Sequence, residues 1–360
     1  MCEFLQIKIP LLYLTYSFTK ETKEEMDPIS QGVLGAIVTQ ATKSKTKSSV
    51  AGIFGFVAGM AADLDILIRS PTDPLLFLEY HRQITHSLVF VPIGGLVTGF
   101  FLFFIFGKRL NISFMESWLM CTIGYGTHGL LDACTTYGTA IFWPFTNDRI
   151  ALSIISIIDP LFTIPAILFF ILYVLKNSSI FAKLGFLWMI SYLLLGAFNQ
   201  QTAIKLGHQI AVERGHTDIK VDAKPSFANI WVWKTLYEVD GRFYVDAVHT
   251  GFNRRVFQGQ SIAKLDPRED FPWLEPDSQQ SQDIKRFQWF GMGYLAVDPK
   301  RKNRIGDIRF SVLPNEVSAL WSIQLDPGAK ADQHVDYVTH RDFGIDKRKK
   351  LWDMILSGWY

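Results

Sequence analysis

The chain has 360 residues, of which 36 are Lys or Arg and 34 are Asp or Glu, so its formal net charge is +2. Hydrophobic residues make up 49% of the chain, charged residues make up 19%, and the mean hydropathy is +0.15. This composition excludes a disordered chain, argues against an ordinary soluble globule, and gives no reason to expect nucleic acid as a partner.

The stretch before residue 26 is apolar over residues 1–18, but it lacks the basic leader and the small-residue cleavage site of a signal peptide. A second start lies at Met26, in the sequence Met-Asp-Pro. We therefore expect residues 1–25 to be an over-called start or an extra apolar segment.

Apolar residues are concentrated in the first 200 positions, and spans approaching 20 apolar residues predict transmembrane helices. Glycines recur inside the first two spans at spacings that favour close packing of helix backbones in lipid. We predict a mainly α membrane domain over residues 26–200, with about five transmembrane helices and one further short or re-entrant segment. The five spans are 50–68, 87–107, 118–137, 160–175 and 184–198, and the short segment is 29–39.

The pattern changes after residue 200, where aromatic and β-branched residues alternate with polar ones on either side of Asp240 and Gly241. Such alternation around an Asp-Gly pair predicts a β-hairpin. Residues 288–297, 308–313 and 319–325 are predicted to be further strands, and 266–282 a polar loop. Residues 201–360 should therefore form a β-rich, mostly antiparallel domain with helical additions outside the membrane.

Basic residues in short loops favour the cytoplasmic side of a membrane. If the spans alternate in direction, three basic loops share one side, with Lys43, Lys45, Lys47, Lys108, Arg109, Lys176 and Lys183. The other side then holds residues 69–86, 137–159 and everything after 200. The sequence thus predicts a multi-pass protein of the bacterial inner membrane with a periplasmic C-terminal domain.

Seven ionisable residues fall at that same periplasmic end, although almost 100 positions separate the first from the last. Such groups near a bilayer are costly, and they usually pair or serve a function. A bound divalent metal, or two, would resolve the conflict between them. The seven are Asp63, Asp65, His81, His86, His128, Asp132 and Asp159.

The spacing of these residues leaves alternatives open. His128 and Asp132 are four apart, so a helix places both on one face, for a shared metal or for an interhelical hydrogen bond. Asp63 and Asp65 diverge on a helix and can share a metal only if the helix ends near residue 62. Otherwise one of them coordinates while the other caps or orients, or both lie at a solvated helix end.

The two loop histidines and the last aspartate also have two interpretations each. His81 and His86 are five apart, wrong for one helix face, but a turn between them would bring both rings inward. Each could also be structural. Asp159 before Pro160 is a strong helix-start signal, so capping alone would explain it.

No GxSxG or Walker motif competes with this cluster. Mixed His and Asp ligands suit zinc best, with manganese as the alternative, and such a site can activate water for hydrolysis. Arg82 is either an anion clamp for a substrate phosphate or carboxylate, or an arginine that faces lipid headgroups.

The same residues lie in an ordered series of motifs that resembles the bacterial membrane-bound metal-dependent hydrolases, a group that includes LexA-regulated inner-membrane members. The series begins at Met26-Asp-Pro and runs through Ala62-Asp-Leu-Asp65, His81-Arg-Gln-Ile-Thr-His-Ser87 and His128-Gly-Leu-Leu-Asp132, then Thr136-Tyr-Gly-Thr139, Trp143-Pro-Phe145 and Ile158-Asp-Pro160.

The resemblance covers about residues 26–200, and it implies a helical membrane domain and a metal-dependent hydrolase. The family often has Thr-His after the opening Asp-Pro, whereas this chain has Ser30-Gln31, which removes one possible ligand and puts a second metal in doubt. A more distant similarity to zinc-dependent phospholipase C and P1-type nucleases would suggest phosphodiester substrates.

We therefore predict metal ligation by Asp63, His81, His86, His128 and Asp132. Catalytic roles fall to Asp65 and Asp159, with the one not bound to metal acting as general base. The partners expected are the lipid bilayer and a lipid or lipid-linked substrate. Two alternatives remain: a non-enzymatic protein whose metal only staples helices, and a transporter with a His/Asp relay.

Overall fold

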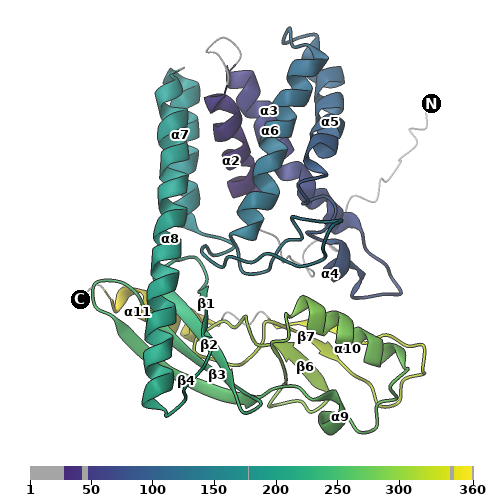
Figure 1. The fold of residues 1–360 in the computed structure, drawn as a ribbon. Coiled ribbons are helices and arrows are strands. Elements are labelled where there is room, and N and C mark those ends of the chain that lie inside the picture. The colour runs from purple at the N-terminus through teal and green to yellow at the C-terminus, as the bar shows by residue number, and fades with distance from the viewer. Residues whose placement is uncertain (1–27, 43–47, 177, 341–343, 359–360) are drawn as a thin grey trace, which may run out of the picture.

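The computed structural model describes residues 28–42, 48–176, 178–340 and 344–358. It shows a helical region stacked on a β-rich region, with the long helix α8 running through both (Figure 1). The predicted segment 1–25 and the basic residues Lys43, Lys45 and Lys47 lie outside the described residues.

Within the described part of the first region there are six longer helices: α2 (Pro28–Ala41), α3 (Ser48–Ala61), α5 (Val91–Leu102), α6 (Phe114–Ala133), α7 (Pro160–Lys176) and α8 (Ser179–Glu213). The short helices η2 (Ala62–Leu67), α4 (Leu76–Tyr80) and η3 (Phe103–Gly107) extend or connect them. The helix α2 is central, because it packs against α3, α6, α7 and α8.

Backbone contact between α2 and α3 is close, as the glycine spacing predicts. A Cβ atom added at Gly59 would lie 2.6 Å from the carbonyl oxygen of Gln31, so no larger residue fits there without a shift. At Gly99 an added Cβ atom would lie 2.9 Å from the Cα atom of Trp118, which shows the same close approach between α5 and α6.

Two helices among the described residues are long and apolar enough to cross a membrane: Ser49–Leu67 and Ser179–Glu213. The predicted spans 87–107 and 160–175 form apolar helices at Val91–Gly107 and Pro160–Lys176, but each is shorter than the roughly 20 residues that cross a bilayer. Five transmembrane helices are therefore not supported by the structure, which supports two candidate spans.

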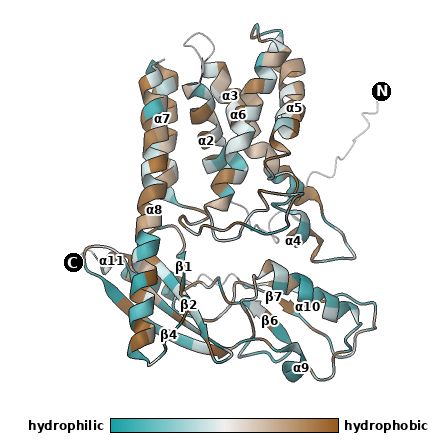
Figure 2. Cartoon of the chain, in the orientation of Figure 1, coloured by the Kyte–Doolittle hydropathy of each residue, from teal (hydrophilic) through white to brown (hydrophobic). Residues whose placement is uncertain are grey.

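The outer surfaces of the helical region are nevertheless strongly apolar. Helices α5 and α7 are mostly hydrophobic along their length, in contrast to α10 (Gln279–Phe290) in the second region (Figure 2). Many residues on these surfaces have a large exposed fraction, for example Phe104 at 67%, Ile164 at 64% and Leu194 at 66%. Such exposed apolar faces fit contact with lipid.

The second region contains two four-stranded antiparallel sheets. The first has the order β1 (Asp222–Pro225), β2 (Val232–Val239), β3 (Arg242–His249) and β4 (Arg255–Ala263). The second has the order β5 (Leu295–Val297), β6 (Arg304–Asp307), β7 (Trp321–Gln324) and β8 (Asp336–Thr339). Helices α9 (Pro267–Asp270), α10 and α11 (Ile345–Leu356) accompany the sheets. The prediction of a β-rich domain with helical additions is confirmed.

The predicted hairpin is also confirmed, because β2 and β3 pair through a turn at Asp240 and Gly241. Both turn residues have positive φ, 49° and 68°, as a tight hairpin turn with the right twist requires.

Two strand predictions are wrong in detail. Most of 288–297 belongs to the end of α10 and the turn after it, and only Leu295–Val297 is a strand. A helix forms here instead of a strand because Ser278 caps its start and because Ile284, Phe287 and Phe290 are buried at helical spacing. Residues 308–313 are not a strand, since β6 ends just before them.

The two regions share packed surfaces. Leu75, Leu78 of α4 and the loop residue Tyr137 belong to one apolar core with α10, β5, β6 and β7. Arg286 on α10 also forms ion pairs with Asp73 at 2.8 Å and with Glu79. The loops 69–86 and 137–159 therefore lie at the same end of the helices as the C-terminal region.

Candidate metal centre

Four buried side chains converge at the end of the helical region nearest the β-rich region. Asp63 comes from η2, His86 from the loop after α4, and His128 and Asp132 from the last two turns of α6. One ligand atom from each lies within 4.8 Å of every other. Four of the five predicted ligands are therefore brought together, and this cluster could hold a metal ion.

The distances between the facing atoms are short and similar. The Nε2 atoms of His86 and His128 are 3.0 Å apart. Asp63 Oδ1 lies 3.2 Å from His128 Nε2 and 3.4 Å from His86 Nε2. Asp132 Oδ2 lies 3.2 Å from His86 Nε2 and 3.7 Å from His128 Nε2.

The outer nitrogen of each histidine already has a hydrogen-bond acceptor. His128 Nδ1 lies 2.5 Å from the carbonyl oxygen of Gly59, and His86 Nδ1 lies 3.2 Å from Asp65 Oδ2. Because these oxygens only accept, they suit the tautomer with its proton on Nδ1, which leaves the Nε2 lone pair of each ring available to a cation. Electron pairs of two imidazoles and two carboxylates thus face one small volume.

A divalent cation fits this donor set. Ligands bound at about 2.0–2.2 Å in a tetrahedral shell lie roughly 3.3–3.6 Å from one another, close to the separations between the facing atoms. Asp63 Oδ2 supports the same interpretation, since it is buried and has no hydrogen-bond partner within the part of the chain that the structure describes. A cation would relieve both the facing lone pairs and the unpaired oxygen.

The local backbone explains how the two aspartates separate. Helix α3 ends at Ala61 and continues as the 3₁₀ helix η2, in which residues two apart point about 120° apart. Asp63 consequently joins the cluster while Asp65 points toward the two loop histidines. This matches the alternative in which one aspartate coordinates and the other orients.

Asp65 holds the loop that carries His86. Its Oδ1 accepts from His81 Nδ1 at 2.7 Å, and its Oδ2 accepts from Thr85 Oγ1 at 2.5 Å and from the backbone N–H of Arg82 at 3.2 Å. With the contact to His86, one carboxylate fixes four groups of this loop. Such carboxylates orient metal-binding histidines and raise their basicity.

His81 lies outside the four-residue cluster. Its Nδ1 is used by Asp65, and its buried Nε2 has no hydrogen-bond partner among the residues described. Of the five predicted ligands, His81 is therefore the one that does not join the other four.

Arg82 is fully buried and sits next to the cluster, not at an open surface. Its Nε lies 3.2 Å from Asp132 Oδ2, its Nη1 donates to Thr135 Oγ1 at 3.1 Å, and its guanidinium lies over the Tyr137 ring at 5.3 Å. The residue has a positive φ of 64°, a costly conformation for a non-glycine residue. Its guanidinium balances the charge of Asp132, and no lipid-facing position is left for it.

Asp159 caps α7 and is separate from the cluster. Its Oδ1 accepts from the backbone N–H of Leu161 at 3.1 Å and from Tyr192 Oη at 2.9 Å. Burial raises the pKa of this carboxyl to about 6. The capping role indicated by the sequence is therefore present, and a catalytic role stays a prediction.

Sequence analysis missed Gln31, which occupies the position where a ligand was judged absent. This fully buried residue of α2 donates from Nε2 to Asp132 Oδ1 at 2.8 Å. The signal available was the run of polar residues in an otherwise apolar helix, since Ser30, Gln31, Thr39 and Gln40 are all buried.

Comparisons with known proteins agree with a membrane protein. Residues 26–203 match the sequence model of a family described as "YdjM inner membrane protein". The chain is similar to "Inner membrane protein YbcI" of Escherichia coli (strain K12), with 31% identity over 98 residues, which cover 26% of this chain and 54% of that protein. It is also similar to "Uncharacterized protein YfhP" of Bacillus subtilis (strain 168), with 25% identity over 100 residues, covering 28% and 29%.

These matches are partial. The chain spans about half the length of YbcI and less than a third of YfhP. No solved structure matches the chain. The family description and the name of YbcI give a membrane location and no activity, so the similarity supports membrane association without assigning a reaction.

Proposed function

We propose that this protein is a metal-dependent hydrolase of the bacterial inner membrane, with its site at the periplasmic face. The observation that carries the proposal is the convergence of Asp63, His86, His128 and Asp132 in a buried cluster. This cluster lies at the end of the apolar helices where the β-rich region packs. A substrate from the membrane interface, such as a lipid, a lipid-linked molecule or another phosphodiester, suits that position.

Zinc is the ion that best suits two imidazoles and two carboxylates, with manganese as the alternative. The two carboxylates also match the charge of a divalent ion. When bound, such an ion would supply Lewis-acid polarisation and water activation at neutral pH. Asp63, His86, His128 and Asp132 would hold it, Asp65 would orient His86, and Arg82 and Gln31 would keep Asp132 in place.

The general base is assigned to a carboxylate outside the ligand set, Asp65 or Asp159. Asp65 is heavily hydrogen-bonded, which favours an orienting role for it. Asp159 has a buried Oδ2 with no hydrogen-bond partner among the described residues, and its pKa near 6 suits proton exchange close to neutral pH. Its backbone carbonyl accepts from Thr163 Oγ1, which contacts Ser30 next to Gln31, so the start of α7 packs close to the residues around the cluster.

A non-enzymatic role is the second candidate, and one observation favours it. Four protein ligands are enough to close a tetrahedral shell, as in structural zinc sites, whereas catalytic sites keep a position open. In that case the ion would only staple η2, the loop after α4 and α6 together.

Elemental analysis of the detergent-purified chain tests the proposal first. We expect about one zinc or manganese per chain in the wild type and little in His86→Ala and Asp132→Ala. The matched control is His208→Ala, because His208 lies on α8 away from the cluster and has no role in it. Metal that is absent from the wild type, even after reconstitution, would overturn the metal site and the hydrolase together.

Activity then separates the two candidates. A metal-loaded wild type should hydrolyse a phosphodiester or lipid substrate in a screen, and the two ligand variants should not. If removal of the metal by a chelator lowers the melting temperature while no substrate is turned over, the stapling role is the correct one.

A further inference from the structure

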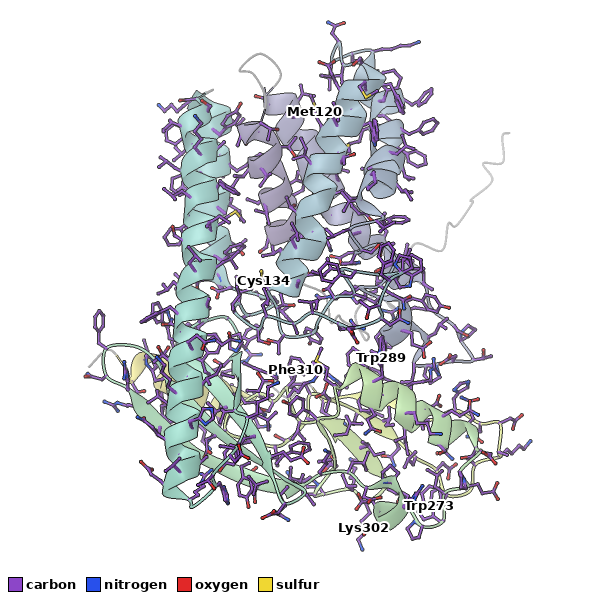
Figure 3. All side chains as sticks on the ribbon, viewed as in Figure 1. Met120, Cys134, Trp273, Trp289, Lys302 and Phe310 are labelled. Atoms are coloured by element: carbon purple, nitrogen blue, oxygen red, sulfur yellow. The ribbon has the colours of Figure 1, made fainter. Side chains whose placement is uncertain are left out.

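A cavity of about 320 Å³ lies where the helical and β-rich regions meet. Its walls come from residues 136–137 and 156–158 of the loops beneath the helices, from β1 and β2, and from residues 309–321. Phe310, one of the lining residues, faces the loops under the helices in Figure 3. None of the four residues of the metal cluster lines this cavity, so it is a separate site.

Three buried cations line the cavity: Lys224, Lys234 and Arg309, with 4%, 3% and 1% of their surfaces exposed. Lys224 on β1 and Lys234 on β2 are direct cross-strand partners. Like charges directly opposite each other destabilise a sheet. Their burial in this arrangement needs an opposing charge.

The protein supplies only part of that opposing charge. Lys224 pairs with Asp222 at 2.7 Å and Arg309 with Asp307 at 2.6 Å. The ammonium of Lys234 instead donates to Ser311 Oγ and to the carbonyl oxygen of Glu316, both at 2.8 Å. Its hydrogen-bond partners are thus neutral, and one buried cation lacks a carboxylate contact among the described residues.

Two further features favour an anionic ligand at this site. Arg309 Nη1 is buried and has no hydrogen-bond partner in the described part of the chain. Burial also lowers the pKa of Lys234 to about 7, despite the opposing effect of the more distant Asp307 and Glu316. A ligand anion would accept from Arg309 and favour the charged form of Lys234.

The rest of the wall is apolar. It includes Tyr137, Ile157, Phe310 and Trp321, whose rings and side chains leave little polar surface. Ile158 and Phe227 also line the cavity, yet they expose 41% and 47% of their surfaces, so they mark its open side. Ile158 directly precedes Asp159 and the apolar helix α7, so this side opens next to the surface that faces lipid.

We propose that this cavity binds the anionic headgroup of an amphiphile, a phosphate or carboxylate attached to an acyl chain. Lys224, Lys234 and Arg309 hold the headgroup, and the chain leaves past Ile158 and Phe227 toward the bilayer. The volume is at the low end for small-ligand pockets, which suits a headgroup with its first carbons and not a whole lipid.

Equilibrium binding to the full chain in detergent tests this with three probes: oleoyl lysophosphatidic acid, inorganic phosphate and oleoyl monoacylglycerol. The first has both headgroup and tail, the second only the anion, and the third only the tail. We expect lysophosphatidic acid to bind about tenfold or more tightly than monoacylglycerol, because hydrogen bonds to a charged group contribute on that scale. It should exceed phosphate by a similar factor, because each buried CH₂ group contributes about 0.8 kcal/mol.

Two variants with a matched control complete the test. Lys234→Met should weaken lysophosphatidic acid binding about tenfold or more, whereas Lys264→Met should not, because Lys264 is an exposed lysine paired with Glu238 near the same sheet. Ile158→Asn leaves the three basic residues in place and adds no charge, so it should weaken the same probe while leaving phosphate unchanged. Melting temperatures identify any variant that fails to fold.

Equal binding of lysophosphatidic acid by wild type and folded Lys234→Met would overturn the proposal. Phosphate that binds as tightly as the lipid would also overturn it, in favour of a free-anion site. Monoacylglycerol that binds as tightly would show that the headgroup charge plays no part. Because the metal ligands are untouched, a failure here leaves the proposed hydrolase standing, and the reverse also holds.

Discussion

Replacing Asp65 by Asn tests whether this carboxylate organises the metal cluster without being part of it. Asn has nearly the same size as Asp, so the change removes a charge and one acceptor without opening a cavity. The Asn amide can present only one acceptor oxygen, whereas Asp65 accepts from His81, Thr85, His86 and the backbone of Arg82. We expect His86 to lose its fixed orientation.

The size of the effect follows from these contacts. A hydrogen bond to a charged group contributes about 1.5–3 kcal/mol, which is roughly a 10–150-fold change in an equilibrium constant. Partners that orient metal-binding histidines change metal affinity by about 10–100-fold. The dissociation constant for Zn²⁺ should therefore rise about 10–100-fold in Asp65→Asn.

Competition with a zinc-binding dye in detergent at neutral pH measures this constant. Asp63→Asn, which removes a predicted ligand, should lose more affinity than Asp65→Asn. Asp148→Asn is the control, because Asp148 is exposed at the same end of the molecule and bonds only to Thr146 among the described contacts. An unchanged dissociation constant in Asp65→Asn would refute the orienting role.

Three other substitutions test the packing, the buried cation and the topology. Gly59→Ala places a Cβ atom 2.6 Å from a carbonyl oxygen of α2 and should destabilise the chain by about 1–3 kcal/mol. Gly126→Ala is the control and should melt near the wild type, because its Cβ atom would meet only a side chain, at 3.2 Å. Because the pKa of Lys234 is lowered to about 7, the folded chain binds fewer protons than the unfolded chain above pH 7. The free energy of unfolding of the wild type should therefore rise by about 2 kcal/mol between pH 7 and 9, relative to that of Lys234→Met. Equal pH profiles of the two proteins would contradict this. Phe252 is 88% exposed in the β-rich region, so Phe252→Cys should react with an impermeant maleimide in intact spheroplasts. Lys108→Cys should not react. The opposite pattern would reverse the proposed orientation.

Sequence reasoning was most reliable where a local pattern determines the structure. The hairpin at Asp240 and Gly241 follows from alternation and two turn residues that tolerate positive φ. The helix over 50–67 follows from continuous hydropathy. The error at 288–297 has a local origin as well: aromatic residues suit both a strand and one face of a helix, and Ser278 as a helix cap decided between them.

The number of membrane spans could not be derived from hydropathy alone. Residues 87–90 carry no charge, and three of the four are apolar. They nevertheless form turns before α5 begins at Val91, because the loop from His81 must turn His86 toward Asp63 and His128. The space that the cluster requires thus shortens the apolar helix. A hydropathy average over a window of residues contains no information about whether a segment forms a helix or the turns that position His86.

The convergence of His86, His128 and Asp132 could be anticipated because each residue lies at an end of a predicted span, and span ends on one side share a depth in the membrane. No comparable rule predicts which residues line the cavity between the two regions. Lys224 and Lys234 meet through strand register, and Arg309 comes from the turn after β6, 75 positions later than Lys234. In the sequence each is an ordinary basic residue. Only burial distinguishes them from the exposed lysines of the same domain. Three basic side chains are buried in one small volume, and Lys234 among them contacts no carboxylate in the described residues, which favours an anion there.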